Sequence, residues 1–163
     1  MVIGKHDYEI VTEQEERLQF ERFSYNDAWT LGSIVARKAR ERNLPILCEI
    51  RINGFEVFRF VNEGAKLHNA LWAERKFRTV ELIQRSSLRA LYMPAVGEDD
   101  LFSDLQHFDR GEYALLGGGF PIRLKGTGMI GSIAISGLPH TEDHELIVES
   151  MSEYLGKETR HLL

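Results

Sequence analysis

The clearest pattern of hydrophobic and polar positions lies between residues 46 and 61. Apolar side chains occupy every second position from Ile46 to Ile52, which is the period of a strand with one buried face. A second apolar run from Phe55 to Val61 follows Asn53-Gly54, a dipeptide favoured in type I′ turns because both central residues need positive φ. The segment predicts a β-hairpin whose first strand is half-buried.

An amphipathic helix is predicted before this hairpin, where apolar positions follow a period near 3.6 residues. Ser24 or Asn26 can cap its first turn, and Asn43 with Pro45 ends it. Basic residues fill the last turn, between Arg37 and Arg42, where they complement the helix dipole. We interpret this cluster as a solvated helix end, with a partner-binding site as the alternative.

A second helical segment is predicted from Ala65 to about Leu91. Ser86-Ser87 predicts a break in it, because serine hydroxyls compete for backbone hydrogen bonds. An acidic run then introduces a short helix expected at residues 101–107. Before the first helix, residues 1–23 are predicted to form an N-terminal extension in which Leu18 and Phe20 are the apolar anchors.

The last third of the chain combines strands, glycines and a closing helix. Residues 113–116 are expected to form a strand that runs into Gly117-Gly118-Gly119, and residues 129–137 form a second strand. The closing helix is predicted to begin with Thr141 as its N-cap and to place His144 at the capping-box position. Together these elements indicate one mixed domain of helices and strands.

Composition narrows the class of protein. The 163 residues match a single domain, and the formal charge of −5 disfavours broad, non-specific nucleic-acid binding. Cys48, the only cysteine, excludes an intramolecular disulfide and lies in an apolar run typical of a buried, unreactive thiol. Neither a signal peptide nor a run of about 20 apolar residues is evident, so we expect a cytoplasmic protein with no membrane partner.

The triple glycine Gly117-Gly118-Gly119 has two interpretations. It lacks the spacing of a phosphate-binding loop and does not open a helix directly. Glycines in a strand pattern commonly permit a bulge or the close approach of another backbone. The alternative is that their N–H groups line a ligand pocket, and both interpretations stay open.

The junction between Ser136 and His144 joins a strand to the closing helix, a position where unpaired helix N–H groups favour a pocket. His140, Asp143 and His144 raise the question of a metal site, but their spacing does not match a known helical metal motif, and we predict none. Asp143 also complements the helix dipole, and His144 can pack locally. Asp143 and His144 together are weak candidates for an acid–base pair.

Trp72, Arg75 and Lys76 place an indole next to two cations on one side of a helix. These residues could hold a ligand carboxylate against an apolar wall. The alternative is an ordinary amphipathic helix surface.

Several of these motifs, taken in order, resemble a known family. They are Asn69-x-x-Trp72-x-x-Arg75-Lys76, Ser86-Ser87, Gly118-Gly119-Phe120-Pro121-Ile122, Ser136-Gly137-Leu138-Pro139 and Asp143-His144. The chain is similar to the GlcG/HbpS-like haem-degrading-domain family, and within it to a short, single-domain cytosolic branch. The resemblance implies an α+β, profilin-like fold, in which helices flank an antiparallel sheet in a single domain. It also implies assembly as a homo-oligomer and binding of haem or another small ligand.

Three hypotheses follow from the residues and the resemblance. The first is a homo-oligomeric protein that binds a small molecule, with haem or a related carboxylated cofactor as the expected ligand. Its binding residues would be Trp72, Arg75, Lys76, Gly117, Gly118, Gly119, Ser136 and His144. The second is an enzyme that uses Asp143 and His144 in the same pocket, and the third is a non-catalytic assembly protein whose motifs form subunit contacts.

Overall fold

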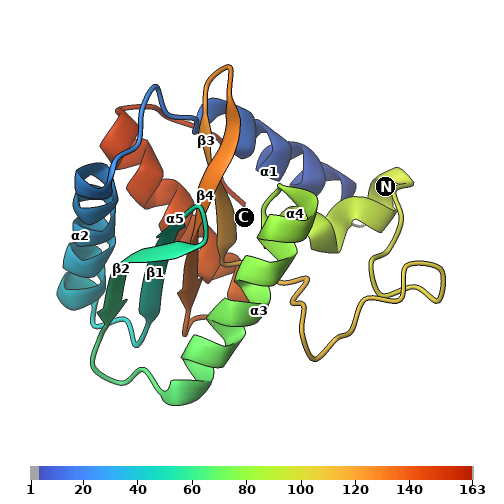
Figure 1. The fold of residues 1–163 in the computed structure, drawn as a ribbon, viewed down its shortest axis with the longest axis horizontal. Helices are drawn as coiled ribbons and strands as arrows, with labels where there is room; N and C mark the ends of the chain where they lie inside the picture. Colours follow the sequence, from blue (N-terminus) through green and yellow to red (C-terminus); the bar gives the residue numbers. More distant parts are fainter. Residues whose placement is uncertain (1–3, 163) are drawn as a thin grey trace.

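The computed structural model describes residues 4–162 and has the α+β architecture expected (Figure 1). The elements in chain order are α1 (Lys5–Arg17), α2 (Tyr25–Arg42), β1 (Leu47–Ile52), β2 (Phe55–Val61), α3 (Leu67–Ile83), α4 (Ser87–Tyr92), the 3-10 helix η1 (Met93–Val96), β3 (Gly119–Leu124), β4 (Gly128–Ser136) and α5 (His140–Leu155). The four strands form one sheet in the order β2-β1-β4-β3, and each neighbouring pair is antiparallel. The predicted single α+β domain with an antiparallel sheet and flanking helices is confirmed.

Helices cover both faces of the sheet. On one face α2 and α5 enclose the main core, which includes Ile50 and Ile135 from the two central strands (Figure 1). On the other face α3 packs Ala73 and Phe77 against Leu47 of β1, in a smaller apolar cluster. The sheet is therefore the middle layer, and a side chain on α3 can reach strand residues from the face opposite to the main core.

The β1–β2 hairpin is confirmed, with φ of 49° at Asn53 and 80° at Gly54 as a type I′ turn requires. The expectation of a half-buried first strand is wrong, because α3 covers the second face. Glu49 is only 3% exposed, and its carboxylate accepts a hydrogen bond from Nε of Arg51. The guanidinium of Arg51 lies 3.9 Å from the centre of the Phe77 ring on α3.

The boundaries predicted for α2 are confirmed by both of its caps. The Ser24 hydroxyl accepts a hydrogen bond from the Asp27 N–H, and the Asp27 carboxylate accepts one from the Ser24 N–H. At the other end Asn43 has a φ of 54°, a left-handed conformation that ends the helix.

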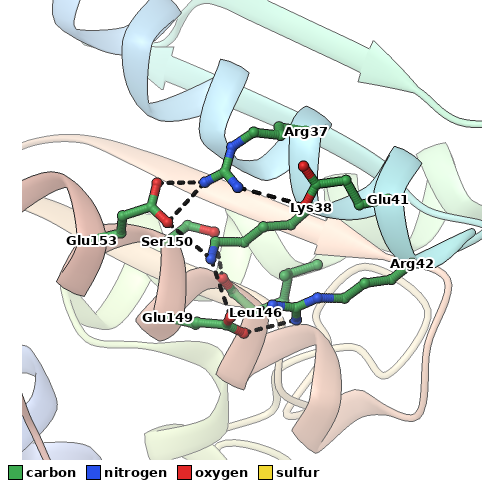
Figure 2. A network of polar contacts seen from close by, with 8 residues as sticks. All are labelled: Arg37, Lys38, Glu41, Arg42, Leu146, Glu149, Ser150 and Glu153. Atoms are coloured by element: carbon green, nitrogen blue, oxygen red, sulfur yellow. Dashed lines mark hydrogen bonds and ion pairs between the residues drawn. The ribbon is translucent and has the colours of Figure 1, made fainter.

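The expectation of a solvated helix end holds for Arg37, Arg40 and Arg42, which are exposed, but not for the buried Lys38. Figure 2 shows how Lys38, Arg37 and Arg42 meet carboxylates of α5. Lys38 is only 6% exposed, and its Nζ lies 3.1 Å from Oε1 of Glu149 and 3.2 Å from Oε1 of Glu153 on α5. Arg37 and Arg42 pair with the same two carboxylates. The cations therefore join α2 to α5 across the edge of the core, an arrangement that needs the tertiary fold and has no local signal.

The break predicted at Ser86-Ser87 is confirmed. Helix α3 ends at Gln84, whose φ is 56°, and α4 begins after Ser86, whose hydroxyl accepts a hydrogen bond from the Arg89 N–H. The N-terminal extension forms α1, which packs on α4 and buries Ile10. Leu18 and Phe20 are each 1% exposed, so both predicted anchors are confirmed.

Residues 97–118 contain neither the helix predicted at 101–107 nor the strand predicted at 113–116. Both predictions are wrong, because this segment satisfies its backbone groups locally and against α3. Oδ1 of Asp100 accepts the Phe102 N–H at 2.9 Å, which favours a turn. The Ala114 N–H donates to the Thr79 hydroxyl on α3 at 3.1 Å, and so a strand partner is not needed. Strand β3 starts only at Gly119.

The prediction that Thr141 is the N-cap of α5 is also wrong. Pro139 precedes the helix, and Thr141 lies inside its first turn. The Asp143 carboxylate, through Oδ1, instead accepts the Leu138 N–H at 3.0 Å and so fixes the turn that leads into the helix. Within residues 4–162 no helix is long and apolar enough to cross a membrane.

Candidate functional site

A pocket lies between the first half of α3 and the start of α5, and we call it the α3–α5 pocket. It has a volume of about 350 Å³, within the range of small-molecule sites. Its lining residues are His68, Asn69, Trp72, Lys76, Leu116, Ser136, Gly137, Leu138, His140 and Asp143. The pocket thus joins two segments that are far apart in the sequence.

Helix geometry explains which side chains of α3 line the pocket. His68, Trp72 and Lys76 are spaced by four residues and therefore lie along one side of the helix. Asn69 fixes the helix start, because its Oδ1 accepts the Lys66 N–H at 2.9 Å. The exposed His68 makes no side-chain hydrogen bond or ion pair with any residue of the described chain. It therefore offers the pocket an imidazole that is not otherwise engaged.

A buried ion pair closes the bottom of the pocket. Nζ of Lys76 lies 3.0 Å from Oδ2 of Asp143 and donates to the Ile135 carbonyl at 2.8 Å. Burial raises the pKa of Asp143 to about 6, an effect that the Lys76 charge opposes. Burial likewise lowers the pKa of Lys76 against the pull of Asp143. Because Lys76 is committed to Asp143 and Ile135, it anchors α3 to α5 and β4 and is not a free cation for a ligand.

The three glycines lie behind the pocket and allow this packing. A Cβ added to Gly118, whose φ is 118°, would lie 2.4 Å from the Ile135 oxygen and 2.5 Å from Nζ of Lys76. A Cβ on Gly117 would lie 2.3 Å from the carbonyl oxygen of His140. The N–H groups of Gly117 and Gly119 already donate to His140 and to Ser87. Close approach of backbone is therefore the role that this geometry supports for Gly117 and Gly118, whereas Gly119 makes room for the side chains of Val80 and Ser87.

The two histidines of α5 have different surroundings. Nδ1 of His140 accepts the Gly117 N–H at 3.0 Å, so the neutral ring carries its proton on Nε2. Burial, followed by the Lys76 charge, lowers the pKa of His140 and favours this neutral form. His144 is fully buried, and its Nε2 lies 2.7 Å from Oε1 of Gln14 on α1. Burial lowers the pKa of His144 to about 3, with a smaller effect from His140.

The structure separates the two members of the proposed acid–base pair. Asp143 contacts Lys76 and Leu138, whereas His144 contacts Gln14, and the described residues show no hydrogen bond between them. His144 does not line the α3–α5 pocket. Among residues 4–162 no three histidine, cysteine, aspartate or glutamate side chains gather in a way that could hold a metal ion.

Arg75 also faces away from this pocket. Its guanidinium lies 4.0 Å from the centre of the Trp72 ring and donates to the carbonyl oxygens of Arg110 and Tyr113, in the segment that follows η1. Arg75 and Lys76 are neighbours in the sequence, and the helix directs them to different sides. Trp72 lies between them.

Of the residues selected from the sequence, the structure gathers Trp72, Lys76, Ser136 and Asp143 around one pocket. Arg75, His144 and the glycines lie outside its lining. Sequence analysis missed His68, Leu116 and Leu138 as lining residues. The spacing of four residues between His68 and Trp72 was the available signal for His68, and the junction from Ser136 to His144 was the signal for Leu138, whereas nothing local indicates Leu116.

Comparison with known proteins gives a consistent family. Residues 23–152 match the family described as Haem degrading protein HbpS-like. The chain is 40% identical to a UPF0303 protein of Azotobacter vinelandii, over 96% of this chain and 93% of that protein. It is 38% identical to a UPF0303 protein of Streptomyces coelicolor, over 89% and 91% of the two chains.

Solved structures show the same fold. The Ybr137w protein superposes with a TM-score of 0.82 at 28% identity, covering 93% of this chain and 89% of that one. PduOC, solved as a complex with haem, has a TM-score of 0.67 at 20% identity and covers 86% and 99%. HbpS has a TM-score of 0.63 at 19% identity and covers 85% and 93%.

Proposed function

The chain belongs to the HbpS-like family of haem degrading proteins, and on this premise we propose that it binds a flat, carboxylated small molecule of the haem class in the α3–α5 pocket. The observation that carries the proposal is the convergence of His68, Trp72 and His140 on one pocket of about 350 Å³. The haem complex of PduOC, a protein of the same fold, supports the choice of haem as the first ligand to test.

An imidazole and the apolar walls of the pocket fit the ring system of this class of ligand. Haem needs an axial nitrogen, oxygen or sulfur donor in a largely apolar pocket, and its iron supplies the redox chemistry when it is bound. His68 offers an imidazole with no competing partner among the described residues, while Trp72, Leu116 and Leu138 supply apolar walls. We therefore assign His68 the ligating position.

His140 has a different part in the proposal. Its Nδ1 is occupied by the Gly117 N–H, so Nε2 carries a proton and can donate a hydrogen bond to a bound molecule. Ligation through Nε2 would instead require that proton to leave or to move to Nδ1, which would break the contact with Gly117. His144, which the sequence analysis named among the ligand-binding residues, is engaged with Gln14 and is assigned a supporting role in packing.

Titration of haem into the purified protein, followed by the Soret band, tests the proposal. We expect a shifted band with the wild-type protein, and loss or displacement of that band in His68→Ala. His6→Ala is the matched control, because His6 is an exposed histidine on α1 and does not line the pocket. An unshifted Soret band, or identical spectra for wild type and His68→Ala, would exclude the assigned role.

We further propose that the protein assembles as a homo-oligomer in the cytoplasm and has no nucleic-acid partner. The net charge of −5 supports the absence of a nucleic-acid partner. The buried, free Cys48 supports the cytoplasmic location. Self-association is supported by three large exposed aromatic side chains at the free edge of the sheet. These are Tyr25 and Trp29 on α2 and Phe55 on β2.

A further inference from the structure

The segment between η1 and β3, residues 97–118, is a long connection without helix or strand, and we call it the long loop. Connections longer than about 12–15 residues are uncommon in compact domains and usually serve a function. This loop is well anchored to α3, because the Ala114 N–H donates to Thr79 and Nη1 of Arg78 donates to the Glu112 carbonyl at 3.3 Å. It also buries Leu101 and Leu115 in a small apolar cluster shared with Ala90 of α4 and Met93 of η1.

Beneath the long loop lies a second cavity of about 410 Å³, which we call the loop pocket. It lies on the other side of Trp72 from the α3–α5 pocket, and Trp72 and Leu116 line both. Its remaining apolar walls are mainly Leu91, Pro94, Phe102 and Leu115. The volume is that of a small-molecule site.

Two arginines give the loop pocket a positive character. Arg75 lies 4.0 Å from the centre of the Trp72 ring, and Arg110 lies 4.5 Å from the centre of the Phe102 ring. Neither arginine has a carboxylate within ion-pair distance among the described residues, although the chain as a whole is acidic. Asp100 is the acidic residue of the lining, and its Oδ1 already accepts the Phe102 N–H.

The hydrogen bonds that anchor the long loop use only part of the Arg75 guanidinium. Arg75 donates to the carbonyls of Arg110 and Tyr113, but its buried Nε has no partner. The exposed guanidinium of Arg110 makes no hydrogen bond with the described residues, so loop anchoring does not explain its position over Phe102. A planar guanidinium stacked on an aromatic ring is well placed to bind a carboxylate through two parallel hydrogen bonds.

We propose that the loop pocket is a second binding site, specific for small aromatic carboxylates, with Arg110 as the residue that binds the carboxylate and Trp72 and Phe102 as the walls for the ring. Arg75 supports the site by holding the loop and by adding positive charge. This site is separate from the α3–α5 pocket and does not depend on haem binding there.

Trp72 provides the signal for the test. The chain has two tryptophans, and Trp29→Phe leaves Trp72 as the single emitter. Benzoate titrated into this variant should change the Trp72 emission with saturation, whereas benzamide, a neutral molecule of similar shape, should bind at least about tenfold more weakly. Arg110→Gln in the same background should weaken benzoate binding by roughly tenfold or more, and Arg110→Lys should weaken it less because the charge is kept.

Arg78→Gln is the matched control. Arg78 also holds the long loop through a backbone carbonyl, but it does not line the loop pocket, so benzoate binding should be unchanged. Equal binding of benzoate and benzamide, or equal losses in Arg78→Gln and Arg110→Gln, would overturn the proposal. Because Trp72 lines both pockets, the loss of the benzoate signal in Arg110→Gln is what assigns that signal to the loop pocket, whereas the Soret band of the wild type and of His68→Ala reports haem binding in the α3–α5 pocket.

Discussion

Nζ of Lys76 lies 3.0 Å from Oδ2 of Asp143, and both side chains are almost completely buried. The pair joins α3 to the start of α5 and forms the bottom of the α3–α5 pocket. Removal of one partner from a buried pair leaves an uncompensated charge, which is more costly than removal of both. The stability of this pair can therefore be tested separately from ligand binding.

We expect Lys76→Met and Asp143→Leu each to lower the free energy of unfolding by about 3–5 kcal/mol. The double variant should be more stable than the sum of the two losses predicts, because neither charge is then left alone. Urea denaturation of the four proteins measures this coupling. Lys125→Met is the control, since its pair with Glu21 is exposed and screened by solvent, so its removal should leave the unfolding free energy nearly unchanged. Additive losses for Lys76 and Asp143 would contradict the prediction.

Gly118 lies just before β3, and its lack of a side chain leaves room for Nζ of Lys76 in the ion pair. Gly118→Ala should destabilise the protein by several kcal/mol, on the order of the cost of a strained left-handed residue plus a displaced backbone contact. Gly126→Ala is matched to it, because Gly126 also has positive φ, 75°, but has nothing within 4 Å of an added Cβ. Gly126→Ala should lower the free energy of unfolding by only about 1 kcal/mol. Similar urea midpoints for the two variants would show that close packing at Gly118 is unimportant.

Features set by neighbouring residues could be predicted from the sequence. The Asn53-Gly54 turn, the Ser24 cap and the break at Ser86 each depend on the conformation or hydrogen bonds of two to four consecutive residues. The α+β class followed from the family resemblance together with these elements. Trp72 and Ser136, which belong to the motifs that carry the resemblance, both line the α3–α5 pocket.

The sequence did not reveal contacts that form only in the folded chain. Lys76 meets Asp143 across 67 positions, and this ion pair engages the cation that the sequence offered to a ligand. The alternating pattern of the first strand places Glu49 on the face expected to meet solvent. Glu49 is buried because α3, which follows later in the chain, covers that face. Residues 113–116 resemble a strand by composition, but Ala114 bonds to Thr79 and so no ladder forms.

His144 should make the protein sensitive to acid. Its pKa is about 3 in the folded chain and 6.5 ordinarily, so the unfolded chain binds the proton first as pH falls. The stability that His144 contributes is complete above pH 6.5 and is lost progressively towards pH 3. His144→Gln, which can still donate to Gln14, should reduce the loss between pH 7 and pH 4 by up to roughly 3 kcal/mol. Unfolding free energies at pH 7 and pH 4 measure it, and equal pH dependence in both proteins would refute it.

Glu15 should have the opposite effect. Burial raises its pKa from 4.5 to about 7 although Arg89 opposes the shift, so the folded chain keeps the proton longer as pH rises. Its contribution to stability is complete below pH 4.5 and is lost between pH 4.5 and 7, by roughly 3 kcal/mol. Thermal unfolding of Glu15→Gln should lack this decline. A steeper decline in the variant than in the wild type would contradict the assignment.

The exposed aromatic surface gives a direct test of self-association. Trp29 is 66% exposed on α2, and the rings of Tyr25 and Phe55 lie 6.1 Å apart beside it at the β2 edge of the sheet. Exposed apolar groups next to an unpaired strand edge favour pairing with another chain. Trp29→Glu should therefore shift the sedimenting species towards the monomer mass of 18.7 kDa. Leu105→Glu is the control, because Leu105 is 82% exposed but lies on the long loop. Equal sedimentation of wild type and Trp29→Glu, at the monomer mass or above it, would exclude this surface as the site of self-association.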